Sequence, residues 1–422
     1  MGFPDLLFNP EKPFVLSWNL LRYTSLRQYP ENRISFAEVR ISDMRILELC
    51  LSPDSGGLEL YMRDFSRWLN DRKDISLFLA LQKESRLDQD LRELKTTILY
   101  LQRKKSPVPL VGAYRLARFI SENRIRIVHV HWKTDLFLAV LAKKLTRHPF
   151  ALIHTRQMMV PGKKRDPYHG FIYRNVDRFI AITAQIARQA RENLGIPAEK
   201  ISQIYYGIRP STKLQPKEIK RIKDKYHFAN RFAVGLVGRI DWYKAQYLLI
   251  DAIAILKKKD LDSQGIIVGH AMDLGYLDAL KNQITDLNID DRISFIDFTD
   301  KPQELMQCFD VLVLPTHVET FGLVLAEAMA LGIPVIGSNA GGVLEIIDDE
   351  QTGLLFETKN AESLAFAIER LMNDTELRSR LSAAGEEKAK REYNTNRQHE
   401  KVLKLMSDTA RHIEQAIDRS FP

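Results

Sequence analysis

The sequence predicts an α/β protein with two doubly wound parallel sheets, and three observations point to this class. Short runs rich in Val, Ile and Leu alternate with amphipathic stretches along most of the chain, which is typical of strand–helix units in a parallel sheet. The 422 residues are too many for one ordinary hydrophobic core, so two domains are expected. Hydrophobic residues make up 45% of the chain, which excludes a mainly disordered protein.

Composition also limits the compartment and the kind of partner. The two cysteines, Cys50 and Cys308, lie far apart and form neither a disulfide framework nor a metal-ligand cluster, which fits a reducing cytosol. No apolar stretch is long enough to span a membrane, and no convincing signal peptide leads the chain. The formal net charge of +8 suits an anionic partner, such as a membrane surface, a nucleic acid or an acidic glycan.

The first 43 residues lack the periodicity of a domain, and the first clear strand is 44–50. We hypothesise that Met44 is the native start and that the preceding residues are an upstream or added arm, which the intact mass of the protein from its own cell would test. Gly56 and Gly57 follow the strand and precede a helix. A glycine pair lets the backbone approach a phosphate, although a tight turn is the alternative. The full Gly-x-Gly-x-x-Gly fingerprint is absent, which argues against a dehydrogenase.

Strand–helix alternation continues through the first half of the chain. We expect strands at 75–80, 98–101, 125–130 and 150–153, and helices at 58–69, 112–122 and 136–145. His129 and His131 lie at the end of one of these strands and His154 follows another, so we expect these imidazoles at the carboxyl edge of the sheet. The His-x-His pair lacks neighbouring acidic or cysteine ligands, so no metal site is expected.

The region between Arg103 and Arg178 is strongly basic and contains interleaved aromatic residues. Its cations are Lys104, Lys105, Arg115, Arg118, Lys143, Lys144, Arg147, Lys163, Lys164 and Arg165. A solvated face is the usual explanation of such a run. The bias to one half of the chain and the accompanying aromatic residues favour contact with an anionic membrane surface. No nucleic-acid-binding motif is present, so no nucleic-acid partner is expected.

The second half opens with a strand that begins at Phe232. This strand delivers Gly238 and Arg239 to the sheet edge, and Lys244 follows at the start of the next helix. An Arg and a Lys that converge there would neutralise a leaving diphosphate, whereas two unrelated surface cations are the alternative. The polar segment 213–225, which precedes this strand, is expected to be a linker.

The most informative stretch is the polar loop that follows the apolar strand 309–315. It carries Glu319 and Gly322 and leads into a helix that contains Glu327. Open α/β sheets bind ligands where the carboxyl end of a strand leads into a helix, and the free N–H groups of that helix suit a diphosphate. One carboxylate can meet a sugar and the other can accept hydrogen bonds from a ribose diol. A chance pair of solvated glutamates is the alternative.

Residues 315–345 contain Glu319 and Glu327, separated by seven residues, and a second glycine-rich turn at Gly341 and Gly342. This run resembles the donor-site signature of the retaining GT-B glycosyltransferases of family 4, the Glu-x7-Glu type. The resemblance covers nearly the whole chain after Met44. It implies two Rossmann-like domains that face each other across a cleft, a nucleotide-sugar donor, retention of the anomeric configuration, and no required metal or cofactor.

The same resemblance assigns roles to particular residues. The catalytic residues are expected to be His154 and Glu319, which would orient the donor hydroxyls or the reacting sugar. The donor-binding residues are expected to be Gly56, Gly57, Arg239, Lys244, Phe321, Gly322, Leu323 and Glu327, of which Glu327 would hold the ribose. Tyr206 stands where the family usually has Asn, which puts a domain-closing contact in doubt. Ala245 stands where the family usually has Gly, which is a small change.

The expected domains are an N-terminal extension of uncertain status at 1–43, an acceptor-binding domain at 44–212, a linker at 213–230, a nucleotide-sugar-binding domain at 231–393, and a C-terminal helix at 394–422 that packs back on the first domain. We expect a cytoplasmic hexosyl- or heptosyltransferase that acts on a cell-envelope glycan or glycolipid of the lipopolysaccharide-core kind, with peripheral contact at the inner face of the cytoplasmic membrane. A sugar-nucleotide 2-epimerase and a non-catalytic nucleotide-sugar or glycan-binding protein are the alternatives.

Overall fold

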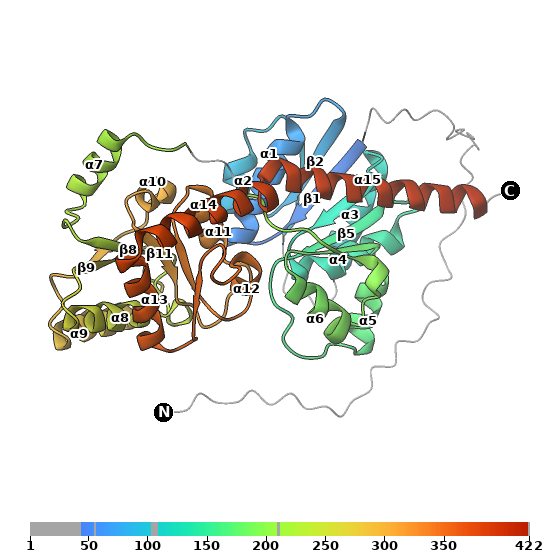
Figure 1. Ribbon diagram of the computed structural model, residues 1–422. Coiled ribbons are helices and arrows are strands. Elements are labelled where there is room, and N and C mark those ends of the chain that lie inside the picture. Colours follow the sequence, from blue (N-terminus) through green and yellow to red (C-terminus); the bar gives the residue numbers. More distant parts are fainter. Residues whose placement is uncertain (1–43, 55, 103–108, 209–211, 421–422) are drawn as a thin grey trace. The chain divides into compact units, whose positions relative to one another are not determined.

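The computed structural model describes residues 44–420, apart from 55, 103–108 and 209–211. These residues form two parallel β-sheets, each with its own helices, which confirms the predicted pair of doubly wound α/β domains. We call them the first lobe (blue to green in Figure 1) and the second lobe (yellow to red). The expected arm at 1–43, together with Arg103, Lys104 and Lys105 of the basic region, lies outside the described residues.

The first lobe contains a seven-stranded sheet in the order β3-β2-β1-β4-β5-β6-β7. Its strands are β1 (Met44–Cys50), β2 (Ile75–Leu81), β3 (Thr97–Tyr100), β4 (Ile127–Val130), β5 (Ala151–Arg156), β6 (Arg178–Ala181) and β7 (Ile201–Gln203). Its helices are α1 (Gly57–Asn70), α2 (Arg86–Leu91), α3 (Leu110–Glu122), α4 (Leu136–Leu145), α5 (Pro167–Arg174) and α6 (Ala184–Leu194), with 3-10 turns η3 (Lys133–Asp135) and η4 (Ala198–Lys200). The strand order reverses between β1 and β4, which makes their carboxyl ends a switch point where such sheets bind ligands.

Strand β1 shows how the sequence builds this sheet. Leu47 and Leu49 pack into one apolar cluster, whereas Ile46 and Cys50 pack into another. Alternate side chains therefore bury opposite faces, as the two-residue period of a strand requires. Because both faces are covered, the strand is apolar almost throughout.

The second lobe repeats the plan with six strands in the order β10-β9-β8-β11-β12-β13. The strands are β8 (Phe232–Val237), β9 (Ser263–Val268), β10 (Ile293–Ile296), β11 (Val311–Leu314), β12 (Val335–Ser338) and β13 (Leu354–Phe356). The helices are α8 (Gln246–Lys258), α9 (Leu274–Asp286), α10 (Pro302–Met306), α11 (Leu323–Ala330), α12 (Val343–Ile346), α13 (Ala361–Asn373) and α14 (Thr375–Glu392), with the 3-10 turn η5 (Trp242–Lys244). Its switch point lies between β8 and β11.

Two segments differ from the expected linker and strand. The polar segment 213–225 contains a helix, α7 (Pro216–Lys225), which begins with proline at its first position. The Glu218 carboxylate accepts a hydrogen bond from the backbone N–H of Gln215 at 2.8 Å. This cap and the initial proline favour a helix in spite of the polar composition of the segment. Strand β5 continues to Arg156, three residues beyond its expected end, because it pairs with β6 as far as Ala181.

The chain crosses between the lobes a second time before its last helix, α15 (Thr395–Ser420). This red helix lies along the first lobe in Figure 1, where Val402 and Met406 join the apolar cluster of β1 and α1. The two crossings lie side by side, because Ile208 pairs with Asn394 in a parallel bridge. A Cβ atom on Gly207 would lie 2.3 Å from the Cα atom of Thr395, so only glycine permits this approach.

Candidate active site

The loops after β8 and β11 meet at the switch point of the second sheet. The Asp241 carboxylate begins η5 by accepting hydrogen bonds from the N–H groups of Tyr243 at 3.0 Å and Lys244 at 3.1 Å. The Tyr243 carbonyl accepts hydrogen bonds from the Thr316 hydroxyl and the His317 N–H, both at 2.9 Å. These bonds fix the two loops against each other, although they are some seventy residues apart in the chain.

Lys244 and Glu319 are brought together by this arrangement. The Lys244 ammonium lies 2.7 Å from Glu319 Oε2, and both side chains are mostly buried. The other carboxylate oxygen accepts a hydrogen bond from the Thr320 N–H at 3.0 Å. The sequence singled out both residues, but it did not predict that they form an ion pair.

Arg239 lies in the same loop but is held loosely. Its side chain is 67% exposed, and its guanidinium lies 3.6 Å from the Asp241 carboxylate. The backbone is fixed, since the Gln246 amide donates to the Arg239 carbonyl at 2.8 Å. An exposed guanidinium on a fixed backbone can turn towards an anion at the mouth of the site.

The loop that carries Glu319 ends in a left-handed residue. Gly322 has φ 93° and precedes the first residue of α11, a conformation that glycine adopts without strain. Among the described residues, the N–H groups of Phe321, Gly322 and Leu323 have no hydrogen-bond acceptor. They therefore remain available to an anion, and their role in donor binding stays a prediction.

The second glycine-rich turn supports this loop. A Cβ atom on Gly341 would lie 2.3 Å from the Glu319 carbonyl oxygen, and one on Gly342 would lie 2.3 Å from the Thr320 carbonyl oxygen. The Gly342 N–H donates to the Glu319 carbonyl at 2.9 Å. Both glycines thus permit close packing between the two loops.

Glu327 lies on α11, and among the described residues its carboxylate has one polar partner. The Gln303 amide donates to its carboxylate at 3.2 Å. Burial raises the pKa of Glu327 to about 7, and the hydrogen bond only partly opposes this rise. Gln303 was not predicted from the sequence, since nothing there places α10 beside α11.

His154 does not reach the carboxyl edge as expected. It lies inside β5, its side chain is fully buried, and its Nδ1 lies 2.9 Å from the Val130 carbonyl oxygen. Burial and the charge of Arg156 lower the pKa of His154 to about 3, so the imidazole is neutral. The expected position of His154 was wrong because β5 continues to Arg156, beyond the apolar residues 150–153. The catalytic role stays a prediction.

Gly56 and Gly57 lie where the sequence places them, at the start of α1. A Cβ atom on Gly57 would meet nothing within 4 Å. Among the described residues, no hydrogen bond or ion pair joins this turn to the loops of Arg239 and Glu319. Their role in donor binding also stays a prediction.

The His-x-His pair has an acidic neighbour after all. Glu48 on β1 lies beside His129 on β4, with Glu48 Oε2 3.0 Å from His129 Nδ1 and in contact with His131 Nε2. Within the described chain, these three residues form the group that could hold a metal ion. Burial opposes ionisation, but the charges of His129 and His131 and their hydrogen bonds lower the pKa of Glu48 to about 2. Among the described residues, His131 Nδ1 has no hydrogen-bond partner. The assumption that no acid lies near was wrong, because sequence does not show which strands are neighbours.

Two family models match most of the described chain. Residues 55–212 match the model described as Glycosyltransferase Family 4, and residues 218–388 match the model described as Glycosyl transferases group 1. The chain belongs to the group 1 glycosyltransferases. The two matches coincide with the two lobes, so the family assignment rests on both halves.

Three relatives of this group 1 glycosyltransferase illustrate the range of similarity. The capsular polysaccharide biosynthesis glycosyltransferase CapM of Staphylococcus aureus is 22% identical over 373 residues, which are 86% of this chain and 89% of CapM. The D-inositol 3-phosphate glycosyltransferase of Nocardia farcinica is 31% identical over 280 residues, which are 61% of this chain and 60% of that protein. The crystal structure of Anabaena HepE in complex with UDP shares the fold, with a TM-score of 0.76 at 23% identity over 86% of this chain and all of HepE.

Contacts of the glycosyltransferase's site loops extend to the first lobe. Phe321 is buried against Tyr206, with ring centroids 5.6 Å apart, so the residue that departs from the family supplies an aromatic contact. The Glu345 carboxylate accepts hydrogen bonds from the N–H groups of Ala184 at 2.8 Å and Gln185 at 3.1 Å. These N–H groups begin α6, so Glu345 serves as a cap from the other lobe.

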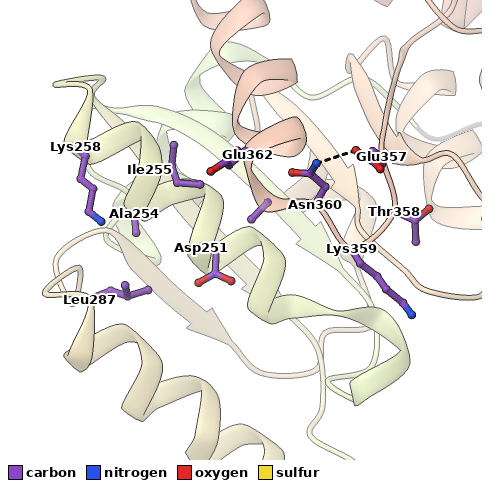
Figure 2. Close-up of a pocket in the computed structure, with 11 residues that line it drawn as sticks. Asp251, Ala254, Ile255, Lys258, Leu287, Glu357, Thr358, Lys359, Asn360 and Glu362 are labelled. Carbon is purple, nitrogen blue, oxygen red and sulfur yellow. Dashed lines mark hydrogen bonds between the residues drawn. The ribbon is translucent and has the colours of Figure 1, made fainter.

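A pocket of about 520 Å³ lies elsewhere on the second lobe of the glycosyltransferase (Figure 2). It lies between α8, which contributes Asp251 and Lys258, and the segment 357–362, which leads into α13. No residue predicted for donor binding or catalysis lines it. None of the described helices combines the length and apolar character of a membrane span.

Proposed function

We propose that this protein is a retaining glycosyltransferase that moves a hexose or heptose from a nucleotide diphosphate to a cell-envelope glycan or glycolipid of the lipopolysaccharide-core kind. The observation that carries the proposal is the Lys244–Glu319 ion pair at 2.7 Å beside the free N–H groups that begin α11. This arrangement places a cation, a carboxylate and backbone donors at the switch point of the second sheet.

The chemistry follows from where charge develops. As the anomeric bond breaks, negative charge grows on the diphosphate and positive charge grows on the sugar. Lys244, Arg239 and the N–H groups of residues 321–323 stabilise the diphosphate. The diphosphate then competes with Glu319 for Lys244, which frees the Glu319 carboxylate to face the sugar. Glu327 accepts hydrogen bonds from the ribose diol once it is ionised.

Retention needs no second catalytic acid in this scheme. The residues of the site include no acid–base pair of the kind that hydrolases use. The leaving phosphate takes the proton of the acceptor hydroxyl on the face from which it departed, so the anomeric configuration is kept. No metal ion is required, because the cations and N–H groups carry the charge. The names of CapM and of the inositol phosphate enzyme support transfer to glycan or polyol acceptors, and HepE with UDP supports a nucleotide donor.

We also propose peripheral contact with an anionic membrane through α3 of the first lobe. Leu110, Val111 and Tyr114 are exposed on this helix, and Arg115 and Arg118 are exposed beside them. Exposed apolar side chains flanked by arginines suit the boundary between headgroups and acyl chains.

The test is a thermal-shift panel of UDP, GDP, ADP and their sugars, with and without EDTA, followed by transfer assays with the donor that binds. A nucleotide that binds only the folded protein raises its melting temperature. We expect one base to stand out, to be indifferent to EDTA, and to lose its effect in Lys244→Ala but not in the control Lys281→Ala, an exposed lysine on α9. Donor turnover without an acceptor would indicate an epimerase, and binding without nucleotide release would indicate a binding protein.

A further inference from the structure

The first lobe carries a buried arginine at the carboxyl edge of its sheet. Arg156 is the last residue of β5, and its side chain is almost inaccessible, with 4% of the residue exposed. Its Nε donates to the Met158 carbonyl at 2.7 Å, and its Nη2 donates to the Met159 carbonyl at 2.9 Å. In the described part of the chain, Nη1 has no hydrogen-bond acceptor.

No carboxylate of the described residues forms an ion pair with this guanidinium. Among the ion pairs of the described residues, none includes Arg156, Lys133 or Lys164. Arginine stays protonated in proteins, and a buried cation without an anionic partner is costly, so such groups are normally paired. The described residues therefore supply no counter-ion for this guanidinium.

Further positive charge lies on the neighbouring strand. Lys133 is exposed and begins the turn after β4, and β4 pairs with β5 through Val130 and His154. Arg156 ends β5 and Lys133 follows β4, so the two residues belong to the carboxyl ends of adjacent strands. Partial burial, together with the charges of Arg156 and Lys164, lowers the pKa of Lys133, as expected when like charges gather without an anion.

The next residue along the chain is also unsatisfied. Gln157 is 7% exposed, and neither its amide nitrogen nor its amide oxygen has a hydrogen-bond partner within the described residues. A buried amide left unpaired costs free energy, and such groups in native proteins usually meet a ligand or water. The polar run Thr155, Arg156 and Gln157 directly after an apolar strand was the sequence signal for this place.

We propose that Arg156, Lys133 and Gln157 bind an anionic group of the acceptor, a phosphate or a carboxylate. A planar guanidinium and an ammonium bind such oxygens through charge-assisted hydrogen bonds, and the amide nitrogen adds a neutral donor. The site lies at the carboxyl edge of the first lobe, whereas the residues for the donor diphosphate lie on the second. That the anion belongs to the acceptor rests on the proposed function. The anion site itself rests on these three residues alone.

The experiment measures binding of inorganic phosphate by calorimetry. It uses the Lys244→Ala protein, in which the donor site is weakened. We expect Lys133→Ala in this background to weaken phosphate binding about tenfold, since it removes one charge-assisted contact. The control is Lys144→Ala, an exposed lysine in the last turn of α4 at the opposite sheet edge. Arg156→Gln should weaken binding further, and if it fails to fold, the Lys133→Ala comparison decides.

Two further measurements distinguish a soluble from a lipid-linked source of the anion, and failure of the anion site from failure of the proposed function. A soluble hexose phosphate that competes with inorganic phosphate supports a soluble acceptor, whereas competition by phosphatidylglycerol vesicles alone supports a lipid-linked one. Equal phosphate binding by Lys133→Ala and Lys144→Ala overturns the anion site, even if UDP-sugars bind the unaltered protein. If phosphate binding responds as expected but no nucleotide binds, the proposed function fails and the anion site stands.

Discussion

Replacing Glu327 with glutamine should change how the stability of this glycosyltransferase depends on pH. Burial of Glu327 on α11 disfavours the charged carboxylate, and the pKa of Glu327 is raised from 4.5 to about 7. Because the folded pKa lies above the unfolded one, the folded state binds the proton more tightly. Ionisation therefore costs nothing below pH 4.5, destabilises the fold increasingly as pH rises between 4.5 and 7, and exerts its full cost above 7.

The size of the effect follows from the same two values. A rise from 4.5 to about 7 corresponds to roughly 3 kcal/mol, at about 1.4 kcal/mol per unit of pKa. Since the residue is only partly buried, solvent screening makes this an upper bound. Glutamine keeps a similar shape and can still bond to Gln303, but it carries no charge at any pH. The variant should therefore gain stability over the unaltered protein as pH rises, by several degrees in melting temperature at pH 8.

The assay is thermal unfolding without nucleotide at half-unit steps from pH 4.5 to 8.5. Glu362→Gln, an exposed glutamate in the first turn of α13, serves as the matched control and should follow the unaltered protein. At the same time, Glu327→Gln should bind the donor nucleotide more weakly, because the ribose diol loses a charged acceptor. Parallel stability curves for Glu327→Gln and the unaltered protein would refute the reasoning that the carboxylate is desolvated.

Three further substitutions test other parts of the site. Lys244→Ala should lower turnover about a hundredfold with at most a small loss of melting temperature, because its ion pair is partly solvated; an equal loss of both would indicate a structural lysine. Ala245→Gly should raise the free energy of unfolding by about 0.5–1 kcal/mol, since this residue has φ 53° in the left-handed region; a denaturant midpoint that falls would contradict this. Glu345→Gln should speed hydrogen exchange at the amides of Ala184 and Gln185, which it caps; unchanged exchange would show that the contact is not formed in solution.

The periodicity of apolar residues predicted much of the fold, and the positions of the polar loops predicted part of the site. Alternating apolar runs predicted both sheets, and the polar loops after β8 and β11 contain the residues that meet at the second switch point. Their meeting follows from strand order, which places the carboxyl ends of β8 and β11 side by side.

The sequence did not show which strands are neighbours in a sheet or how far each strand extends. Glu48 and His129 lie side by side because β1 pairs with β4, and no local pattern encodes that pairing. His154 was misplaced because the polar residues that follow it still extend β5 through pairing with β6. Arg156 was overlooked for the same reason, since the expected strand ended at residue 153, whereas β5 ends at Arg156.

The two chain crossings between the lobes have a mechanical consequence. Because Ile208 and Asn394 are paired and Gly207 touches Thr395 backbone to backbone, both crossings form one narrow pivot. Rotation of the lobes about this pairing keeps it intact, whereas sliding or separating them would break it. Either movement would also change the contacts of Phe321 with Tyr206 and of Glu345 with α6. A rotation of one lobe against the other is then one angular movement absorbed by a few backbone dihedrals. Any side chain at position 207 would push the pivot apart and so spoil alignment at a distance from either substrate.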